Sequence, residues 1–501
     1  MKRKISFPSA FTVLFIILIF AAVLTHIVPS GMYSRLSYEA SSNEFIITSP
    51  DGSESTLNAN SENLEKLNIH LDISKFVDGV IKKPIAIPDT YERLEQRPQG
   101  IIELFKSPIR GILDTTDIMI FVLILGGIIG LLNKSGAFDA GMAYISKKSR
   151  GKEFLLVSIV FVLTTLGGTT FGLAEETIAF YPVLMPLFLV NGFDPIICIS
   201  AIYMGSTIGT MVSTVNPFSV VIASNAAGIS FNEGLIFRIV MLILCSAITL
   251  AYMYYYAKKV RNKPELSLVY ESRESINNRF LKNYDANQNI EFTFRKKLML
   301  IIFALSFILM VWGVSSAGWW FEEMSTLFLV VGIIEMILSG MGEKEAVNTF
   351  VGGAAELVGV ALMVGLARSI NIIMDDGLIS DTLLYYSSNL VSSMGKGLFS
   401  LVMYIIYIFL GFFINSSSGL AVLSMPIMAP LADTVGISRS IVVDAYNWGQ
   451  GLIGFITPTG LILVSLEMAE TTFDKWLKFI LPLMAIIGVF CAVMLYVEAL
   501  L

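Results

Sequence analysis

Apolar residues occur along this chain in long blocks, separated by short stretches rich in glycine, proline, serine and threonine. The blocks Ala10 to Val28, Leu235 to Ala257 and Phe479 to Val497 each match the roughly 20 apolar residues that a helix needs to cross a bilayer. Other blocks, such as Phe154 to Leu166 and Leu420 to Ala432, are too short to cross alone and lie beside a second block. The pattern predicts a polytopic helical membrane protein in which spanning helices alternate with paired shorter segments.

Polar stretches between the blocks suggest five regions. We expect an N-terminal span over residues 1–29, an exterior loop or cap over 30–115, a first membrane repeat over 116–257, a cytoplasmic linker over 258–297, and a second repeat with scaffold helices over 298–501. The first block is interpreted as an uncleaved span, because it is longer than a signal-peptide core and no small-residue cleavage site follows it.

Basic clusters indicate the orientation. Lysine and arginine gather at residues 2–4, 147–152, 258–263 and 295–297. Such clusters mark the cytoplasmic side of a membrane protein. The sequence therefore predicts a multi-pass protein of the bacterial inner (cytoplasmic) membrane with a cytoplasmic N-terminus, and it places the polar segment 30–115 outside.

Similar motifs recur at a fixed separation. Pro182 recurs as Pro426 and Gly205 recurs as Gly449, each 244 residues later. The stretch that holds the first proline and the stretch that holds the second are separated by an odd number of predicted spans, so they enter the membrane from opposite sides. Inverted repeats of this kind are typical of secondary transporters. We therefore expect an all-α polytopic membrane protein with two inverted repeats, each with a re-entrant helical hairpin and a broken transmembrane helix.

Polar residues collect at four places within the apolar blocks. Two are predicted hairpin tips, at residues 166–172 and 415–419, and two are predicted helix breaks, at 213–217 and 456–460. Glycine and proline free backbone groups there, and such groups are tolerated at membrane depth only inside protein or around a polar cavity. The alternative is a packing kink in which the hydroxyls bond back to their own helix. The candidate substrate-binding residues are Gly168, Thr169, Thr170, Ser213, Thr214, Asn216, Asn415, Ser416, Ser417, Ser418, Thr457 and Thr459, and a candidate sodium site lies near Thr214, Asn216 and Thr457.

Two acidic residues, Glu175 and Glu176, follow the first tip within an apolar stretch. Charged groups at membrane depth are costly and tend to be functional, so both are candidate substrate-binding residues that would favour a cation. The alternative role is to compensate the dipole of the helix that follows the tip. The second half has Val422 and Leu423 at the corresponding positions, so the halves differ in charge.

Other charged residues receive structural interpretations. Arg368 is expected to be the only clearly intramembrane base, and Glu335 or Glu356 is expected to pair with it. Asp433 is expected at the exterior mouth of the second hairpin, with Arg439 near a membrane boundary.

Composition narrows the function classes. The 501 residues are 55% hydrophobic and only 15% charged, whereas average soluble proteins carry about 25% charged residues. Three cysteines lie in apolar runs, only two histidines occur, and none has metal-ligand spacing. The sequence therefore predicts no enzyme activity and no cofactor, and the net charge of −6 suggests no nucleic-acid partner.

Several motifs resemble those of the YfcC family, within the group of the DcuC anaerobic dicarboxylate carriers. They read GGTTFGLAEET over 167–177, FYP over 180–182, STVNPF over 213–218, SSSG over 416–419, MPIMAPLAD over 425–433 and TPT over 457–459. The resemblance covers nearly the whole chain. It implies an ion-transporter-superfamily fold and carriage of arginine and ornithine, or of C4-dicarboxylates. The second tip reads Asn415-Ser416-Ser417-Ser418-Gly419, where a Pro-Ser-Gly-Ser-Gly-like turn is expected.

These observations favour a secondary active transporter of small charged solutes in the lipid bilayer, with an arginine/ornithine-type antiporter as the leading hypothesis. A C4-dicarboxylate carrier, coupled to ions or working by exchange, is the alternative, and Arg368 would then neutralise carboxylates. Na⁺ or H⁺ is the candidate coupling ion, and the resemblance makes a homodimer a candidate assembly. A channel or a membrane enzyme is disfavoured, because neither a continuous polar stripe nor a nucleophile–base pair is found.

Overall fold

The computed structural model describes residues 8–69, 71–77, 81, 84–148, 151–281, 291–317, 319–390 and 394–500. Within these residues, nine helices are long and apolar enough to cross a membrane. The helical polytopic architecture is thereby confirmed, whereas the inverted orientation and re-entrant depth of the hairpins stay predictions. The N-terminal basic residues 2–4 lie outside the described part of the chain.

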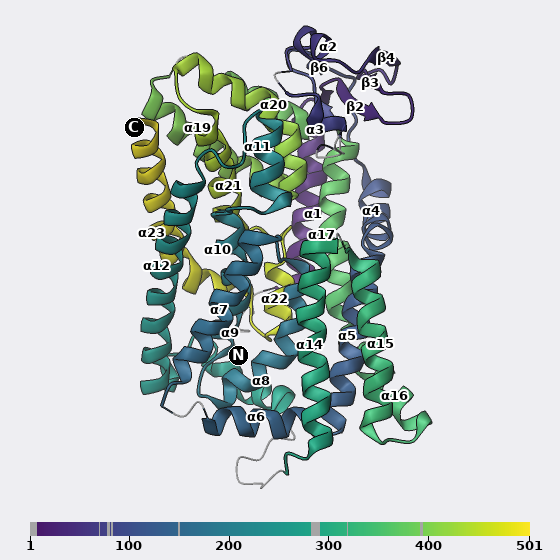
Figure 1. Cartoon of the computed structure of the whole chain (residues 1–501), viewed down its shortest axis with the longest axis vertical. Helices are drawn as coiled ribbons and strands as arrows, with labels where there is room; N and C mark the ends of the chain where they lie inside the picture. Colours follow the sequence, from purple (N-terminus) through teal and green to yellow (C-terminus); the bar gives the residue numbers. More distant parts are fainter. Residues whose placement is uncertain are drawn as a thin grey trace, which may run out of the picture.

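The first half of the chain is a series of helices that leads from the first apolar block to a long helix ending in basic residues (Figure 1). Its elements are α1 (Ala10–Ile27), α4 (Ile101–Asp114), α5 (Thr116–Lys134), α6 (Ala137–Lys148), α7 (Glu153–Thr170), η1 (Glu175–Phe180), α8 (Tyr181–Val190), α9 (Pro195–Ile199), η2 (Ser200–Met204), α10 (Gly205–Met211), η3 (Pro217–Val221), α11 (Ile222–Ala226) and α12 (Leu235–Asn262).

The linker and the second half continue the helical series. The linker contains η4 (Pro264–Leu266), η5 (Tyr270–Ser272) and α13 (Arg273–Phe280). The second half contains α14 (Phe294–Ala317), α15 (Phe321–Ser339), α16 (Glu343–Glu356), α17 (Val358–Asp376), α18 (Ser380–Asn389), α19 (Lys396–Phe413), α20 (Ser417–Val435), α21 (Arg439–Gly454), α22 (Ile462–Met468) and α23 (Phe473–Leu500).

The polar segment after α1 forms a small domain, here called the cap and defined as residues 30–97. Two short helices, α2 (Ser61–Lys66) and α3 (Ser74–Val77), accompany six strands: β1 (Gly31–Met32), β2 (Arg35–Glu39), β3 (Glu44–Thr48), β4 (Glu54–Asn58), β5 (Ile85–Ala86) and β6 (Glu92–Arg93). One antiparallel sheet has the order β4-β3-β2-β5, and β1 pairs with β6. The cap lies at one end of the molecule (Figure 1). It adds β-structure to an otherwise helical fold, and α4 occupies the end of the segment expected outside.

The linker is fastened to the end of the first helical series through Asp194. This side chain accepts hydrogen bonds from the Ser267 hydroxyl at 2.6 Å and from the Tyr256 hydroxyl at 2.8 Å, and it caps α9 through the Ile197 amide at 3.2 Å. Burial raises the pKa of the Asp194 carboxyl, although these hydrogen bonds act in the opposite direction. The part of the linker that the structure describes is therefore packed on the helices rather than detached from them.

Candidate functional site

Helices α7 and α10 approach closely enough that glycine is required between them. A methyl group at Gly209 would lie 2.1 Å from the Thr165 carbonyl oxygen, and one at Gly168 would lie 2.3 Å from the Ser206 carbonyl oxygen. Any side chain at either position would push the helices apart. The first candidate tip, at the end of α7, is therefore held against the helix that leads into the first break.

The first tip and the first break are joined by hydrogen bonds. The Thr169 hydroxyl accepts from the Thr214 amide at 2.9 Å and lies 3.1 Å from the Thr214 hydroxyl. The Asn216 side-chain amide donates to the Gly168 carbonyl at 3.0 Å, and its oxygen accepts from the Phe218 amide at 2.8 Å. These backbone groups are freed because α10 ends at Met211 and η3 begins only at Pro217. Buried threonine and asparagine side chains thus satisfy peptide groups that would otherwise be unpaired.

The structure modifies the expected geometry of this tip. Gly168, Thr169 and Thr170 form the last turn of α7, and the non-helical turn is residues 171–174. Thr170 is exposed, and its hydroxyl donates back to the Leu166 carbonyl at 2.6 Å. That is the alternative interpretation of a polar residue in an apolar helix, and it applies to Thr170 alone among the three.

The second tip and the second break are joined in the same manner. The Asn415 amide donates to the Thr459 carbonyl at 3.1 Å, and the Thr457 hydroxyl donates to the Phe412 carbonyl at 3.3 Å. Gln450 on α21 adds a bond from its amide to the Asn415 carbonyl at 3.2 Å. In each half, the tip is therefore joined to the break by hydrogen bonds.

The start of α20 is capped at the second tip. The Ser416 hydroxyl accepts from the Gly419 amide at 3.1 Å, and the Tyr446 hydroxyl on α21 donates to the Ser417 carbonyl at 2.7 Å. The positive end of a 19-residue helix dipole lies here, beside the half-buried Ser417 and Ser418. Tyr446 and Gln450 are tip-holding residues that the sequence reasoning missed, because nothing in a buried helix distinguishes them from packing residues.

The hydrogen-bonded tip and break of the first half and those of the second half belong to helices that pack on each other at the centre of the molecule. The Tyr203 hydroxyl in the first half donates to the Gly454 carbonyl in the second at 2.6 Å, α10 packs on α21, and α11 and η3 pack on α20. No hydrogen bond between described residues joins Thr214 or Asn216 directly to Thr457. The sodium site suggested for these three residues stays a prediction.

The two acidic residues after the first tip, Glu175 and Glu176, differ in their contacts. Glu176 is buried, and its carboxylate accepts the Ala174 amide at 3.0 Å, which caps its own turn. Glu175 is half-buried, and among the described residues its carboxylate belongs to no ion pair. Glu176 therefore has a structural contact at the start of η1, whereas a solute-binding role of Glu175 stays a prediction.

The expected pairing of Arg368 is wrong. Arg368 pairs with Asp114 of α4, and both side chains are partly exposed. Glu335 is fully buried, and both of its carboxylate oxygens lack a hydrogen-bond partner. The prediction failed because α17 packs along α4, which brings an acid from the distant first half closer than the acids of the neighbouring helices.

Arg368 is not the only arginine within a candidate membrane span, because Arg238 lies in the candidate span Leu235–Asn262. Arg238 on α12 is fully buried and pairs with Asp444 on α21. Arg238, which lies three residues after the start of an apolar block, was not singled out from the sequence. Asp433, expected at the mouth of the second hairpin, is exposed and pairs with Arg439 between α20 and α21.

Several buried polar atoms near the centre lack partners. The hydroxyls of Ser219 on η3 and Ser224 on α11, and the side-chain amide nitrogen of Asn447 on α21, are buried without a hydrogen bond. An unpaired buried polar group costs about 1–3 kcal/mol. Because η3 and α11 pack on α20 and α21, these groups lie on the helices where the two halves meet. They are candidate solute contacts that periodicity could not distinguish from core positions.

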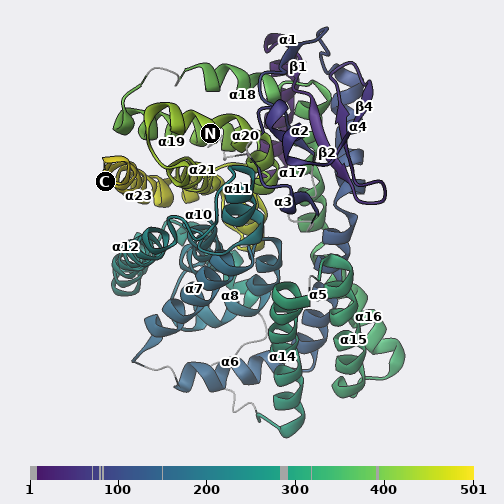
Figure 2. The same ribbon diagram turned by 45° about the horizontal axis from the view of Figure 1, so that its top comes forward.

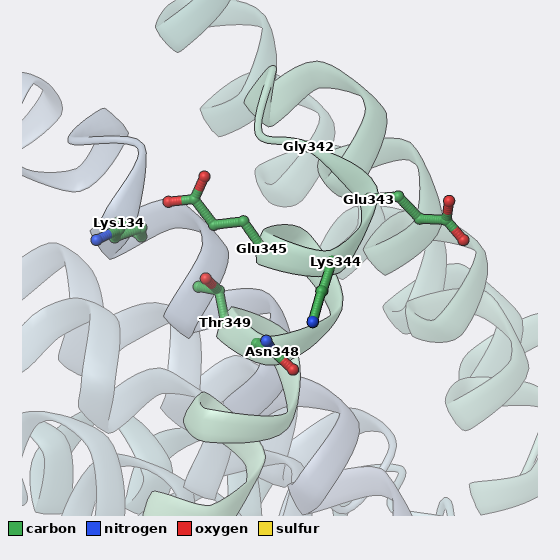
Figure 3. A pocket seen from close by; sticks show the side chains of 7 residues that line it. All are labelled: Lys134, Gly342, Glu343, Lys344, Glu345, Asn348 and Thr349. Carbon is green, nitrogen blue, oxygen red and sulfur yellow. The ribbon is translucent and has the colours of Figure 1, made fainter.

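A separate depression of about 790 Å³ lies where α5 ends and α16 begins. Figure 3 shows Lys134 of α5 across from Glu345 and Thr349 of α16, whereas Glu343 points away. None of the predicted site residues lines this depression. Within the described part of the chain, no group of three or more His, Cys, Asp or Glu is placed to hold a metal ion.

Comparison with known proteins gives the family. The chain is 49% identical over 497 residues to an uncharacterised protein of Haemophilus influenzae, covering 99% of this chain and 98% of that one. It is 29% identical over 499 residues to YfcC of Escherichia coli, whose name describes a candidate basic amino acid antiporter, with 95% and 93% of the two chains covered.

Two solved transporter structures are more distantly similar. The YdaH transporter of Alcanivorax borkumensis aligns over 98% of both chains with 16% identity and a TM-score of 0.38. MtrF of Neisseria gonorrhoeae aligns over 98% of this chain and 95% of its own with 13% identity and a TM-score of 0.37. Residues 7–500 match the family described as C4-dicarboxylate anaerobic carrier. The chain is therefore a multi-pass membrane transporter of the DcuC family.

Proposed function

We propose that this carrier exchanges cationic amino acids of the arginine and ornithine type. The observation that carries the proposal is the unpaired carboxylate of Glu175 beside the first tip. No lysine, arginine or histidine occurs in residues 166–182, 211–221, 410–423 or 454–463, which contain both tips and both breaks. A carboxylate in a region without bases favours a cationic solute, because desolvation strengthens an unscreened charge.

The α-carboxylate of such a solute has a separate place to bind. The start of α20 offers the positive end of its dipole, and Ser417 and Ser418 line that end. The Asn447 amide nitrogen supplies a further buried donor on the neighbouring helix. A site with a carboxylate at one tip and a helix start at the other matches an amino acid that carries a cationic side chain.

A dicarboxylate is the second candidate, and the family description favours it. Two carboxylates would need two positive partners. Arg238 is held by Asp444, and Arg368 is held by Asp114. Helix starts alone would then have to neutralise a dianion beside Glu175. The charge distribution around the tips therefore supports the cationic solute over the dicarboxylate.

The remaining features of the proposal concern setting and coupling. The carrier works in the bacterial inner membrane with a cytoplasmic N-terminus, because the basic clusters share one predicted face. In exchange, the concentration gradient of one solute drives the movement of the other, so this mode of transport needs no cofactor. Na⁺ or H⁺ coupling and a homodimeric assembly belong to the same proposal.

Counterflow in proteoliposomes tests the solute class. Vesicles loaded with unlabelled arginine, ornithine, succinate or fumarate are diluted into each labelled solute, and protein-free vesicles serve as the control. Uptake of labelled arginine into ornithine-loaded vesicles is expected. Succinate–fumarate exchange without arginine exchange would contradict the proposal.

A further inference from the structure

The cap is fastened to α18 of the second half. Arg35 of β2 forms an ion pair with Asp381 of α18 at 2.7 Å, and the Tyr33 amide donates to the same carboxylate at 2.9 Å. The Tyr91 hydroxyl lies 2.8 Å from the Thr382 hydroxyl, and its ring stacks on that of Tyr385 with centroids 4.2 Å apart. These contacts attach one edge of the cap firmly to the membrane part.

The cap also rests on two helices near the candidate site, α20, which begins at the second tip, and α11, which follows the first break. The apolar core of the cap, which includes Leu36, Phe45 and Ile85, continues into Val422 of α20, and Ile222 of α11 packs against it. Strand β5 lies along α20. Val422 is only 5% exposed, although it belongs to a helix outside the cap.

The two covered positions adjoin the candidate site. Val422 lies four residues after Ser418 at the second tip, and Ile222 lies six residues after Asn216 at the first break. By the spacing of the repeat, Val422 corresponds to Glu175 of the first half. The cap therefore covers, in one half, the position that carries the carboxylate in the other. In Figure 2 the cap lies beside α11 and α20 and overlaps α17.

We infer that the cap is the outer gate of the transport path, sealed by apolar contact of Ile85 with Val422 and Ile222 and held shut by the Arg35–Asp381 pair. Since α11 and α20 come from different halves and pack on each other, a solute that enters between them from this side must first displace the cap. Apolar contact excludes water without a specific bond, so it can separate and re-form during each cycle. The inference takes from the proposed function only that the solute passes between the tips.

Cysteine accessibility tests the gate without any solute. The native cysteines Cys198, Cys245 and Cys491 are buried, so they give a low background. Val422→Cys is expressed in intact cells, exposed to a membrane-impermeant methanethiosulfonate, and its remaining free thiol is titrated after denaturation. Ser55→Cys on the exposed β4 reports whether the cap faces the outside. Ile222→Cys replaces Val422→Cys if that variant does not fold.

Removing the Arg35–Asp381 ion pair should make the cap open more often. Arg35→Ala removes the pair with Asp381, whereas Lys66→Ala removes the exposed pair with Glu62 inside the cap and is the matched control. Val422→Cys is expected to react slowly alone and with Lys66→Ala, and roughly 5- to 30-fold faster with Arg35→Ala. Equal rates in all three, or an unreactive Ser55→Cys, would overturn the inference.

Tethering provides the converse test. Ile85→Cys and Val422→Cys joined by a short bis-methanethiosulfonate linker should abolish counterflow and regain it on reduction, whereas each single variant with the same reagent should remain active. Tethered protein that still exchanges solute would also overturn the inference. Neither labelling nor reversible trapping depends on which solute is carried, so failure of the gate is distinguishable from failure of the proposed solute class.

Discussion

Arg238 on α12 and Asp444 on α21 form an ion pair in which the two side chains are 1% and 0% exposed. The pair joins the last long helix of the first half to the second half. Arg238 also donates to the Phe231 carbonyl at 2.9 Å, but its second terminal nitrogen and the second carboxylate oxygen of Asp444 have no partner. A buried pair of this kind depends on both members, since removing one leaves an uncompensated charge.

Arg238→Met is therefore expected to lower the free energy of unfolding by about 3–5 kcal/mol, and Arg238→Met with Asp444→Leu should recover most of that loss. Thermal unfolding in detergent, followed by tryptophan fluorescence, measures both. Arg110→Ala is the control, because its pair with Asp376 is exposed and should cost less than about 1 kcal/mol. A double variant as unstable as the single one would contradict this interpretation.

Thr169→Val should strongly reduce transport while Thr170→Val leaves it nearly unchanged. The Thr169 hydroxyl holds the Thr214 amide, whereas the Thr170 hydroxyl only bonds back to its own helix at an exposed position. Losing the partner of the buried Thr214 amide costs about 1–3 kcal/mol at the first break. Initial counterflow rates at matched protein levels measure the effect. Equal losses in both variants would show that the hydrogen bond between the Thr214 amide and the Thr169 hydroxyl is not required for transport.

Gly209→Ala should destabilise the protein, because its methyl group would meet the Thr165 carbonyl at 2.1 Å and separate α7 from α10. Gly352→Ala on the exposed face of α16 has no atom within 4 Å and should be neutral, or stabilising by up to about 1 kcal/mol through helix propensity. Comparison of the two melting temperatures checks the prediction. If the Gly209→Ala and Gly352→Ala proteins had the same melting temperature, α7 and α10 would be able to separate without cost.

The parts of this molecule that the sequence allowed us to predict depend on local pattern. Apolar blocks located the helices, and the glycine, threonine and asparagine runs located the places where helix ends are tied together, because the chain must satisfy freed backbone groups near where it frees them. Thr169 with Thr214, and Asn415 with Thr459, follow from that requirement once the segments are paired.

The features that were predicted wrongly or missed depend mainly on contacts between helices that are distant in the sequence. Arg368 was expected to meet an acid of the second half, but Asp114 reaches it from α4. Arg238 was missed because nothing near it in the sequence indicates that it is buried and paired with Asp444, 206 residues away. The strands of the cap went unpredicted because only Leu36 and Phe45 mark the inner face of β2 and β3, too few for a clear alternation.

If the carboxylate of Glu175 selects a cationic solute, Glu175→Gln should change the solute preference of the carrier whereas Glu176→Gln should not. Glu176→Gln keeps an oxygen to accept the Ala174 amide, so it is the matched neighbour in which one charge is also removed. Purified wild type and both variants are reconstituted, and the ratio of arginine counterflow to succinate counterflow is measured for each. Glu175→Gln is expected to lower that ratio by roughly tenfold or more, as loss of about 1.4 kcal/mol of binding would do, while Glu176→Gln stays near wild type. An unchanged ratio in Glu175→Gln would contradict selection of the solute by this carboxylate.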